Sequence, residues 1–170
     1  MSNSNSESIH ACASLKEEDI QALESVYPDY IVEKSENHLR LAIPVELGVP
    51  RDVLLLPSHS KSKPASYTQS TNSREPSATI KLRLAHLPPV LLDLFLPDGY
   101  PLFHPPTISA LHIRQGWISN EGQLAQILLK QWNEGDSVLC IWVELIRSGD
   151  FLHSLRLIDD SGTIWYVVHL

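Results

Sequence analysis

A proline-rich stretch in the middle of the chain, FLPDGYPLFHPPTIS at residues 95–109, restricts the possible folds more than any other feature. Each proline fixes its own φ angle and lacks an amide donor, so neither a helix nor a central strand can run through the stretch. Tyr100, Phe103 and Ile108 stand among the prolines, and a disordered linker does not usually contain such large apolar residues. We therefore expect a rigid, packed corner, with a proline-lined binding groove as the alternative.

The residues before this corner predict a helix. Ser14 and Glu17 have the spacing of a capping box, in which each side chain satisfies a free amide, so the helix is expected to begin at Ser14. Pro28 ends it near Ser25 or Val26, because the residue before a proline avoids the helical region. Its apolar stripe consists of Ile20, Leu23, Val26 and Tyr27.

Alternation of apolar and polar residues then indicates a sheet. Residues 39–45 and 80–84 alternate in this way, and residues 90–96 are a more strongly apolar strand. The sequence HLPP at 86–89 predicts a turn, and residues 107–111 predict a fourth strand after the corner. Most connections are short, which favours an antiparallel meander over parallel crossovers.

The chain after the corner predicts helices. A first helix is capped by Ser119 or Asn120, and a second begins at Ser137 and is apolar nearly all round, so it should pack deeply. Residues 151–158 continue as a further helix, DDSG at 159–162 predicts a turn rather than an acid–base pair, and a strand-like tail follows. The helix capped by Ser119 or Asn120 presents four apolar residues on one face: Leu124, Ile127, Leu128 and Trp132.

Together these elements predict one α+β domain: an N-terminal helix, a four-stranded antiparallel meander sheet, a proline-rich turn and C-terminal helices. Residues 1–13 are rich in serine and asparagine and are expected to be disordered. The domain is expected to cover residues 14–158, and residues 159–170 to form a C-terminal tail. Residues 57–77 contain almost no large apolar side chain and are expected to be a low-complexity insert.

Charge and composition narrow the function classes. The net charge is −7, and only the segment 51–83 is basic, with six basic and two acidic residues. A protein with negative net charge lacks the basic surface that nucleic acid requires, so nucleic acid is not expected as a partner. No apolar run has the length that spans a bilayer, so a membrane is not expected as a partner either. The polar N-terminus does not look like a signal peptide, which favours the cytoplasm, with the nucleus as a second compartment.

The residues that usually carry chemistry do not predict an active site. Two distant cysteines, scattered histidines and isolated glycines indicate no metal site, no cofactor and no phosphate-binding loop. Cys140 lies in an apolar run, so we expect a small buried hydrophobe rather than a nucleophile. Three tryptophans are expected to anchor the core, whereas Trp165 lies in a tail with little to pack against.

The order of the elements, with IQALESVYPDYI in the first helix and GYPLFHPP after the third strand, resembles the RWD domain. That family is a relative of ubiquitin-conjugating enzymes and lacks their catalysis. Its mark is Tyr-Pro, three spacer residues and Pro, here Tyr100, Pro101 and Pro105, with Pro106 following. The segments HLPPVLLDLFLPDGYPLFHPPTISA and LLKQWNEGDSVLCIWVELI are similar to the N-terminal RWD domain of RING-between-RING ubiquitin ligases of the androgen-receptor-associated type.

This resemblance implies a non-catalytic docking module. In those ligases, zinc-binding RING domains follow the RWD domain and carry the ubiquitin chemistry, and a chain with two cysteines cannot hold them. The expected partner is a ubiquitin-pathway component or the HEAT-repeat, ribosome-associated activator of the amino-acid-starvation kinase, which several RWD domains bind. The alternatives are a divergent conjugating enzyme acting through Cys140 and a homodimeric scaffold that pairs through Trp165.

Two groups of residues are the candidate sites. The family motif is expected to be structural: Tyr100 buries its ring and sends its hydroxyl to backbone acceptors in the turns. The second group is the solvent side of the first helix, where carboxylates could steer a basic partner, and an ordinary solvated face is the alternative. This expected partner face consists of Glu17, Glu18, Gln21 and Glu24.

Overall fold

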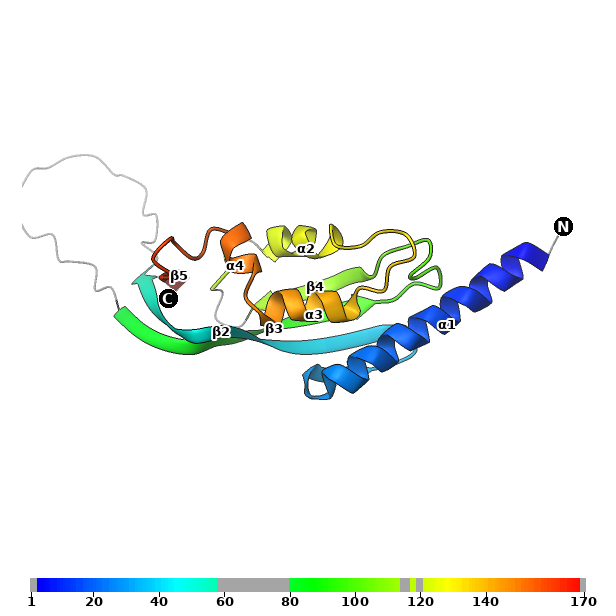
Figure 1. The fold of residues 1–170 in the computed structure, drawn as a ribbon, viewed down its shortest axis with the longest axis horizontal. Helices are drawn as coiled ribbons and strands as arrows, with labels where there is room; N and C mark the ends of the chain where they lie inside the picture. Colours follow the sequence, from blue (N-terminus) through cyan, green and yellow to red (C-terminus); the bar gives the residue numbers. More distant parts are fainter. Residues whose placement is uncertain (1–2, 58–79, 114–116, 119–120, 169–170) are drawn as a thin grey trace, which may run out of the picture.

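The computed structural model describes residues 3–57, 80–113, 117–118 and 121–168 (Figure 1). It confirms the α+β class, with an N-terminal helix, an antiparallel sheet and C-terminal helices. The elements are α1 (Asn3–Val26), the 3-10 turn η1 (Pro28–Tyr30), β1 (Ile31–Lys34), β2 (His38–Pro57), β3 (Ile80–Phe95), β4 (Thr107–Ile113), α2 (Glu121–Leu129), α3 (Leu139–Arg147), α4 (Phe151–Ser154) and β5 (Ile164–Val168).

The sheet is a meander with one added strand. Strands β1, β2, β3 and β4 follow one another as antiparallel neighbours, as the short connections predicted. Strand β5 returns from the C-terminal end and pairs with β2 in parallel, so the predicted strand-like tail is part of the sheet. Because β1 and β5 share one edge of β2, β1 lies beside its first half and β5 beside its last residues.

The predicted turn at residues 86–89 is wrong. Strand β3 runs without a break through this segment, so two predicted strands are one, and the short strand β1 completes the meander. Ile43 pairs with Val90 but Val45 pairs with Leu87, so β3 carries an extra residue in a bulge at Pro88 and Pro89. A bulge tolerates proline because the ladder there does not need its amide, and this removes the reason for a turn.

The predicted helix start at Ser14 is also wrong. Helix α1 begins at Asn3 and runs through residues that were expected to be disordered. Ser14 therefore lies inside the helix, and its hydroxyl donates to Glu18 Oε1 at 3.1 Å instead of capping an amide. The end at Val26 agrees with the prediction from Pro28. The division of the chain into domain, insert and tail stays a prediction, and nearly all of residues 57–77 lies outside the described residues.

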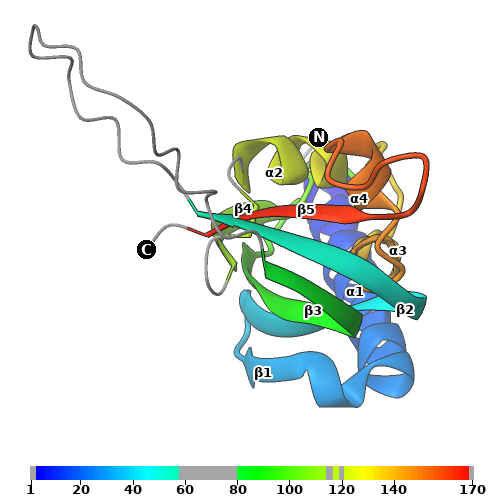
Figure 2. The same ribbon diagram turned by 90° about the vertical axis from the view of Figure 1, so that its left-hand side faces the viewer.

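One face of the sheet forms the core. Leu39, Leu41 and Ile43 are buried, whereas His38 and Arg40 point to the exposed face, as the alternation predicted. Figure 2 looks along the sheet and shows α2, α3 and α4 gathered on one side of it. The largest fully buried side chains are Trp142, Tyr100 and Phe151.

The C-terminal helices are shorter than predicted. Helix α2 ends at Leu129, so Trp132 follows the helix, where it packs partly buried against the core. The predicted caps Ser119 and Asn120 lie outside the described residues. Within the part of the chain that the structure describes, no helix has the length and apolar character needed to cross a membrane.

Candidate protein-interaction surfaces

Helix α1 presents the expected partner face to solvent. Glu17, Glu18 and Gln21 are exposed, and Glu24 is partly buried. Gln21 Nε2 donates to Glu17 Oε1 at 3.1 Å, four residues away on the same side of the helix. Neither Glu17 nor Glu18 forms an ion pair with another described residue. Two carboxylates on this face therefore remain available to a basic partner.

Glu24 differs from the other carboxylates of this face. Lys34 Nζ donates to Glu24 Oε1 at 2.7 Å, and this hydrogen bond raises the pKa of Lys34. The pair ties α1 to β1 and neutralises the charge of Glu24 locally. Beside it, a hollow of about 520 Å³ lies between α1 and the β1–β2 turn, with Lys16 and Glu17 in its lining. The negative potential of the face therefore comes from Glu17 and Glu18.

The family motif forms a packed corner. Tyr100 is completely buried, Pro101 and Pro106 are buried, and Pro105 is partly buried. The Tyr100 hydroxyl donates to Asp19 Oδ2 and accepts the Val138 N–H at 3.0 Å. The burial of the ring agrees with the prediction. The prediction that this hydroxyl donates to backbone carbonyls of the turns is wrong, because it donates to the Asp19 side chain of α1 instead.

Asp19 is the buried polar residue that sequence reasoning missed. Only 5% of it is exposed, and burial raises the pKa of its carboxyl, while hydrogen bonds from Tyr100 and from the amides of Val138 and Leu139 act in the opposite direction. Burial and the Asp19 charge also raise the pKa of Tyr100 well above its ordinary value. Since Val138 and Leu139 begin α3, one carboxylate joins α1, the corner and α3.

Asp19 follows two glutamates in the segment KEEDI at residues 16–20, and nothing in its local pattern distinguishes it from them. The one signal of burial was the position of Asp19 next to the apolar residue Ile20. The buried prolines and this network support the packed corner rather than the groove. Between Tyr100 and Pro106, the exposed residues are Phe103 and His104.

Neither cysteine has the setting of a nucleophile. Cys140 on α3 is only partly buried, less than the sequence predicted, whereas Cys12 is 1% exposed. Burial and the nearby Asp19 charge raise the pKa of the Cys140 thiol, which disfavours the reactive thiolate. Among the described residues, no group of three His, Cys, Asp or Glu side chains could hold a metal ion.

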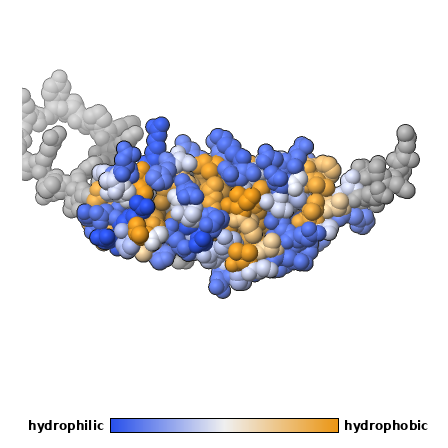
Figure 3. Space-filling model, in the orientation of Figure 1, coloured by the Kyte–Doolittle hydropathy of each residue, from blue (hydrophilic) through white to orange (hydrophobic). Residues whose placement is uncertain are grey.

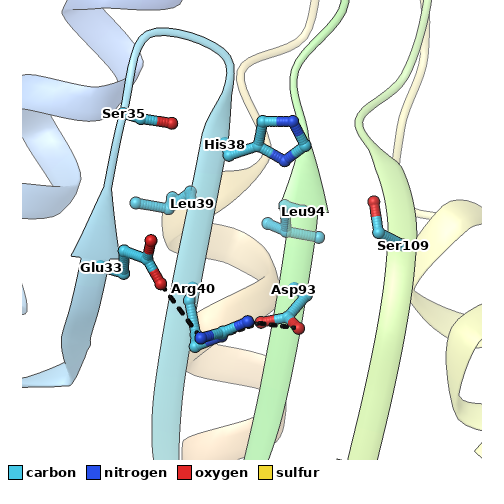
Figure 4. Close-up of a pocket in the computed structure, with 8 residues that line it drawn as sticks. All are labelled: Glu33, Ser35, His38, Leu39, Arg40, Asp93, Leu94 and Ser109. Atoms are coloured by element: carbon cyan, nitrogen blue, oxygen red, sulfur yellow. Dashed lines mark hydrogen bonds and ion pairs between the residues drawn. The ribbon is translucent and has the colours of Figure 1, made fainter.

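The exposed face of the sheet carries a row of charges that the sequence analysis did not single out. Figure 4 shows Glu33, Arg40 and Asp93 side by side on β1, β2 and β3, next to a hollow of about 270 Å³. Arg40 Nε donates to Asp93 Oδ1 at 2.6 Å, and Arg40 Nη1 donates to Glu33 Oε2 at 3.0 Å. The only cation of the row is thus paired on both sides, which leaves it little capacity for a ligand.

A third surface is apolar. Figure 3 shows hydrophobic patches between hydrophilic side chains in the middle of the molecule, where Figure 1 draws α2 and α3. The exposed apolar residues of these helices are Leu129 and Ile141, with 39% and 47% of their surface accessible. Scattered apolar residues of this kind are common on protein surfaces and do not by themselves mark a site.

Comparisons with known proteins agree with this architecture. The model of the RWD domain family matches residues 14–148. A curated relative, the E3 ubiquitin-protein ligase itt1 of Schizosaccharomyces pombe, is 29% identical over 135 residues, which are 77% of this chain and 26% of the ligase. The chain thus spans about a quarter of the length of that relative. No solved structure matches the chain at a significant level. The family match covers most of the sequence, and this chain therefore belongs to the RWD domain family.

Proposed function

We propose that this chain is a non-catalytic protein-interaction domain that docks a partner or substrate for a ubiquitin ligase of the RING-between-RING type. Membership of the RWD family and the likeness to part of a ubiquitin ligase support this role. The setting of Cys140 supports it as well, because a raised thiol pKa does not suit thioester chemistry.

The observation that carries the proposal is the unequal use of the two candidate sites. The polar groups of the Tyr-Pro corner already have partners inside the protein. The Tyr100 hydroxyl and the Asp19 carboxylate hydrogen-bond each other and the amides at the start of α3. The solvent face of α1 keeps the Glu17 and Glu18 carboxylates free of ion pairs with described residues. The α1 face is therefore the surface that we assign to the partner.

The chemistry of this face selects a basic protein surface as its partner. Complementary charge mainly raises the rate of association, and the effect weakens as salt screens charges beyond about 8 Å at physiological ionic strength. The HEAT-repeat, ribosome-associated activator and ubiquitin-pathway components are the partners we propose, in the cytoplasm with the nucleus as a second compartment.

The test reverses the charge of the free carboxylates. We expect the Glu17→Lys, Glu18→Lys variant to associate more slowly with a partner captured from lysate, with a defect that shrinks as the salt concentration rises. Glu24 is left intact, since Glu24→Lys would place two cations together at Lys34. The matched control is Glu134→Lys with Asp160→Lys, which makes the same charge change at exposed positions outside α1.

Association rates measured by surface plasmon resonance at low and high salt decide the outcome. Equal slowing by both double variants would mean that net charge matters and the α1 face does not. Unchanged rates for both variants at low salt would exclude the α1 face as the docking surface.

A further inference from the structure

The first half of β3 has an open edge. Strand β2 pairs with β3 from residue 80 to residue 95, with interruptions at two irregularities, but β4 pairs with it only at residues 90–95. Beyond that point, none of the described strands lies on the outer side of residues 80–86. Figure 2 shows β3 on one side of β2 and β5 on the other, so β3 is the outermost described strand on its side of this half of the sheet. Alternate amides and carbonyls of an edge strand point outward and can pair with another chain.

The apolar layer of this half-sheet continues to the open edge. Ile164 of β5, Val53 of β2 and Leu82 of β3 lie in one register row, and their exposed fractions are 0%, 1% and 41%. The neighbouring row ends at Ile80, which is 54% exposed. Val53 lies on the inner strand β2 and Ile164 is bridged by Ile158, whereas no described strand lies on the outer side of β3 at residues 80–86. A strand added beside β3 would cover Leu82 and Ile80 in the same way.

The other face of the open edge is basic. Lys81 and Arg83 alternate with the apolar residues, so both project to the opposite face of the sheet. Lys81 Nζ lies 2.9 Å from Asp52 Oδ2, but neither Arg83 nor the nearby Arg51 forms an ion pair with a described residue. Both arginines line a hollow of about 260 Å³ that also contains Ser161 and Thr163. On this face Lys81 and Arg83 stand against the single carboxylate of Asp52, so the outer edge of β3 carries positive charge in an otherwise acidic chain.

The chemistry of the edge discriminates between the possible occupants. A second copy of β3 in antiparallel register would place Lys81 opposite Arg83, and directly opposed like charges destabilise a sheet. The chain's own segment 58–79 carries three basic residues and one acidic residue, with Tyr67 as its only large apolar side chain. Such a segment has too few apolar side chains to cover Ile80 and Leu82, and its basic side chains would repel Lys81 and Arg83. An extended segment in which apolar and acidic residues alternate would place its apolar side chains on the apolar face and its acidic side chains on the basic face.

We propose that the outer edge of β3 at residues 80–86 binds such an apolar–acidic segment of a partner protein as an added strand. The apolar side chains cover Ile80 and Leu82, and the acidic side chains face Lys81 and Arg83. Arg83, which forms no ion pair with a described residue, is the cation that an acidic side chain of the added strand would pair with. This surface goes beyond the α1 face, because it selects a partner segment of the opposite charge.

The probe is a labelled synthetic peptide of alternating valine and glutamate, measured by fluorescence anisotropy with the full chain. Two peptides control for its chemistry. One carries N-methyl groups on alternate amides, which removes strand pairing and keeps the charge, and the other has lysine in place of glutamate. We expect only the unmodified acidic peptide to bind, and to slow hydrogen exchange of the amides at residues 80–86.

Variants of the protein then locate the site. Lys81→Gln with Arg83→Gln should weaken binding of the acidic peptide about three- to tenfold, as expected for two exposed charge pairs. The matched control, Lys130→Gln with Arg156→Gln, removes the same charge at exposed positions outside the half-sheet and should leave binding unchanged. The Glu17→Lys, Glu18→Lys variant should also bind the peptide normally, which separates this site from the α1 face.

Equal binding of the N-methylated peptide would overturn the proposal, because it would show charge attraction without strand pairing. Equal weakening by the control pair, or slowed exchange confined to residues outside β3, would overturn it as well.

Discussion

Removal of a single oxygen atom tests the buried network of the Tyr-Pro corner. Tyr100→Phe keeps the ring, which is completely buried, and deletes the hydroxyl. That hydroxyl donates to Asp19 and accepts the Val138 N–H. The variant therefore removes the hydroxyl acceptor of the Val138 N–H, which keeps only the Asp19 carboxylate, and removes a donor from that buried carboxylate, while the apolar packing stays nearly unchanged.

The expected loss of unfolding free energy is large for so small a change. Loss of one of the two acceptors of a buried amide costs up to about 1 kcal/mol, and a hydrogen bond to a charged group contributes about 1.5–3 kcal/mol. The two contributions share one hydroxyl and are not fully additive, so we expect a loss of about 1.5–3 kcal/mol at neutral pH. A matched control is Tyr27→Phe, whose hydroxyl donates to Glu144 Oε2 at 2.7 Å near the surface, with an expected loss of about 1 kcal/mol or less.

The loss should depend on pH in a defined direction. Burial raises the folded-state pKa of Asp19 above its ordinary value of 3.8, and the Tyr100 hydroxyl is one of the groups that lower it. Without that hydroxyl the folded-state pKa rises further. A carboxyl with a raised folded-state pKa contributes its full stability below the unfolded-state pKa and loses it as pH rises through the folded-state value. The defect of Tyr100→Phe should therefore be smallest near pH 4 and grow as the pH increases.

Urea unfolding followed by tryptophan fluorescence, over a series of pH values, measures this effect. Trp142 is fully buried and provides the signal. In an Asp19→Asn background the pH-dependent part of the Tyr100→Phe defect should vanish, because no carboxyl titrates at that position. A defect below about 1 kcal/mol at neutral pH, or one that is equal at all pH values in the Asp19 protein, would refute the network as described.

Two further predictions concern catalysis and the insert. With activating enzyme, ATP and ubiquitin, we expect no reducible adduct on a non-reducing gel, and an adduct that disappears in Cys140→Ser would contradict the non-catalytic role. Replacement of residues 58–75 by a short Gly/Ser linker should shift the unfolding free energy by about 1 kcal/mol or less, because β2 and β3 already pair at Leu55 and Ile80; a loss of cooperative unfolding would show that this segment is needed for the fold.

Local signals in the sequence predicted much of the architecture. The end of α1 follows from Pro28, and the buried face of β2 follows from the alternation of residues 39–45, because both depend on neighbours within a few positions. The Tyr-Pro motif and the order of elements also indicated the RWD family before any contact was known. Of the expected partner face, Glu17, Glu18 and Gln21 are exposed on one helix, as the 3.6-residue period predicts.

Only the tertiary structure decided the rest, because the deciding contacts join distant residues. Asp19 and Tyr100 lie 81 positions apart, so no local pattern could show that a carboxylate would satisfy the tyrosine. The HLPP segment looks like a turn until β2 pairs with it across a bulge in β3, and Glu24 looks like a free charge until β1 brings Lys34 to it. The open edge of β3 depends on where β4 stops pairing, and that point is set by the whole sheet rather than by the residues of the edge.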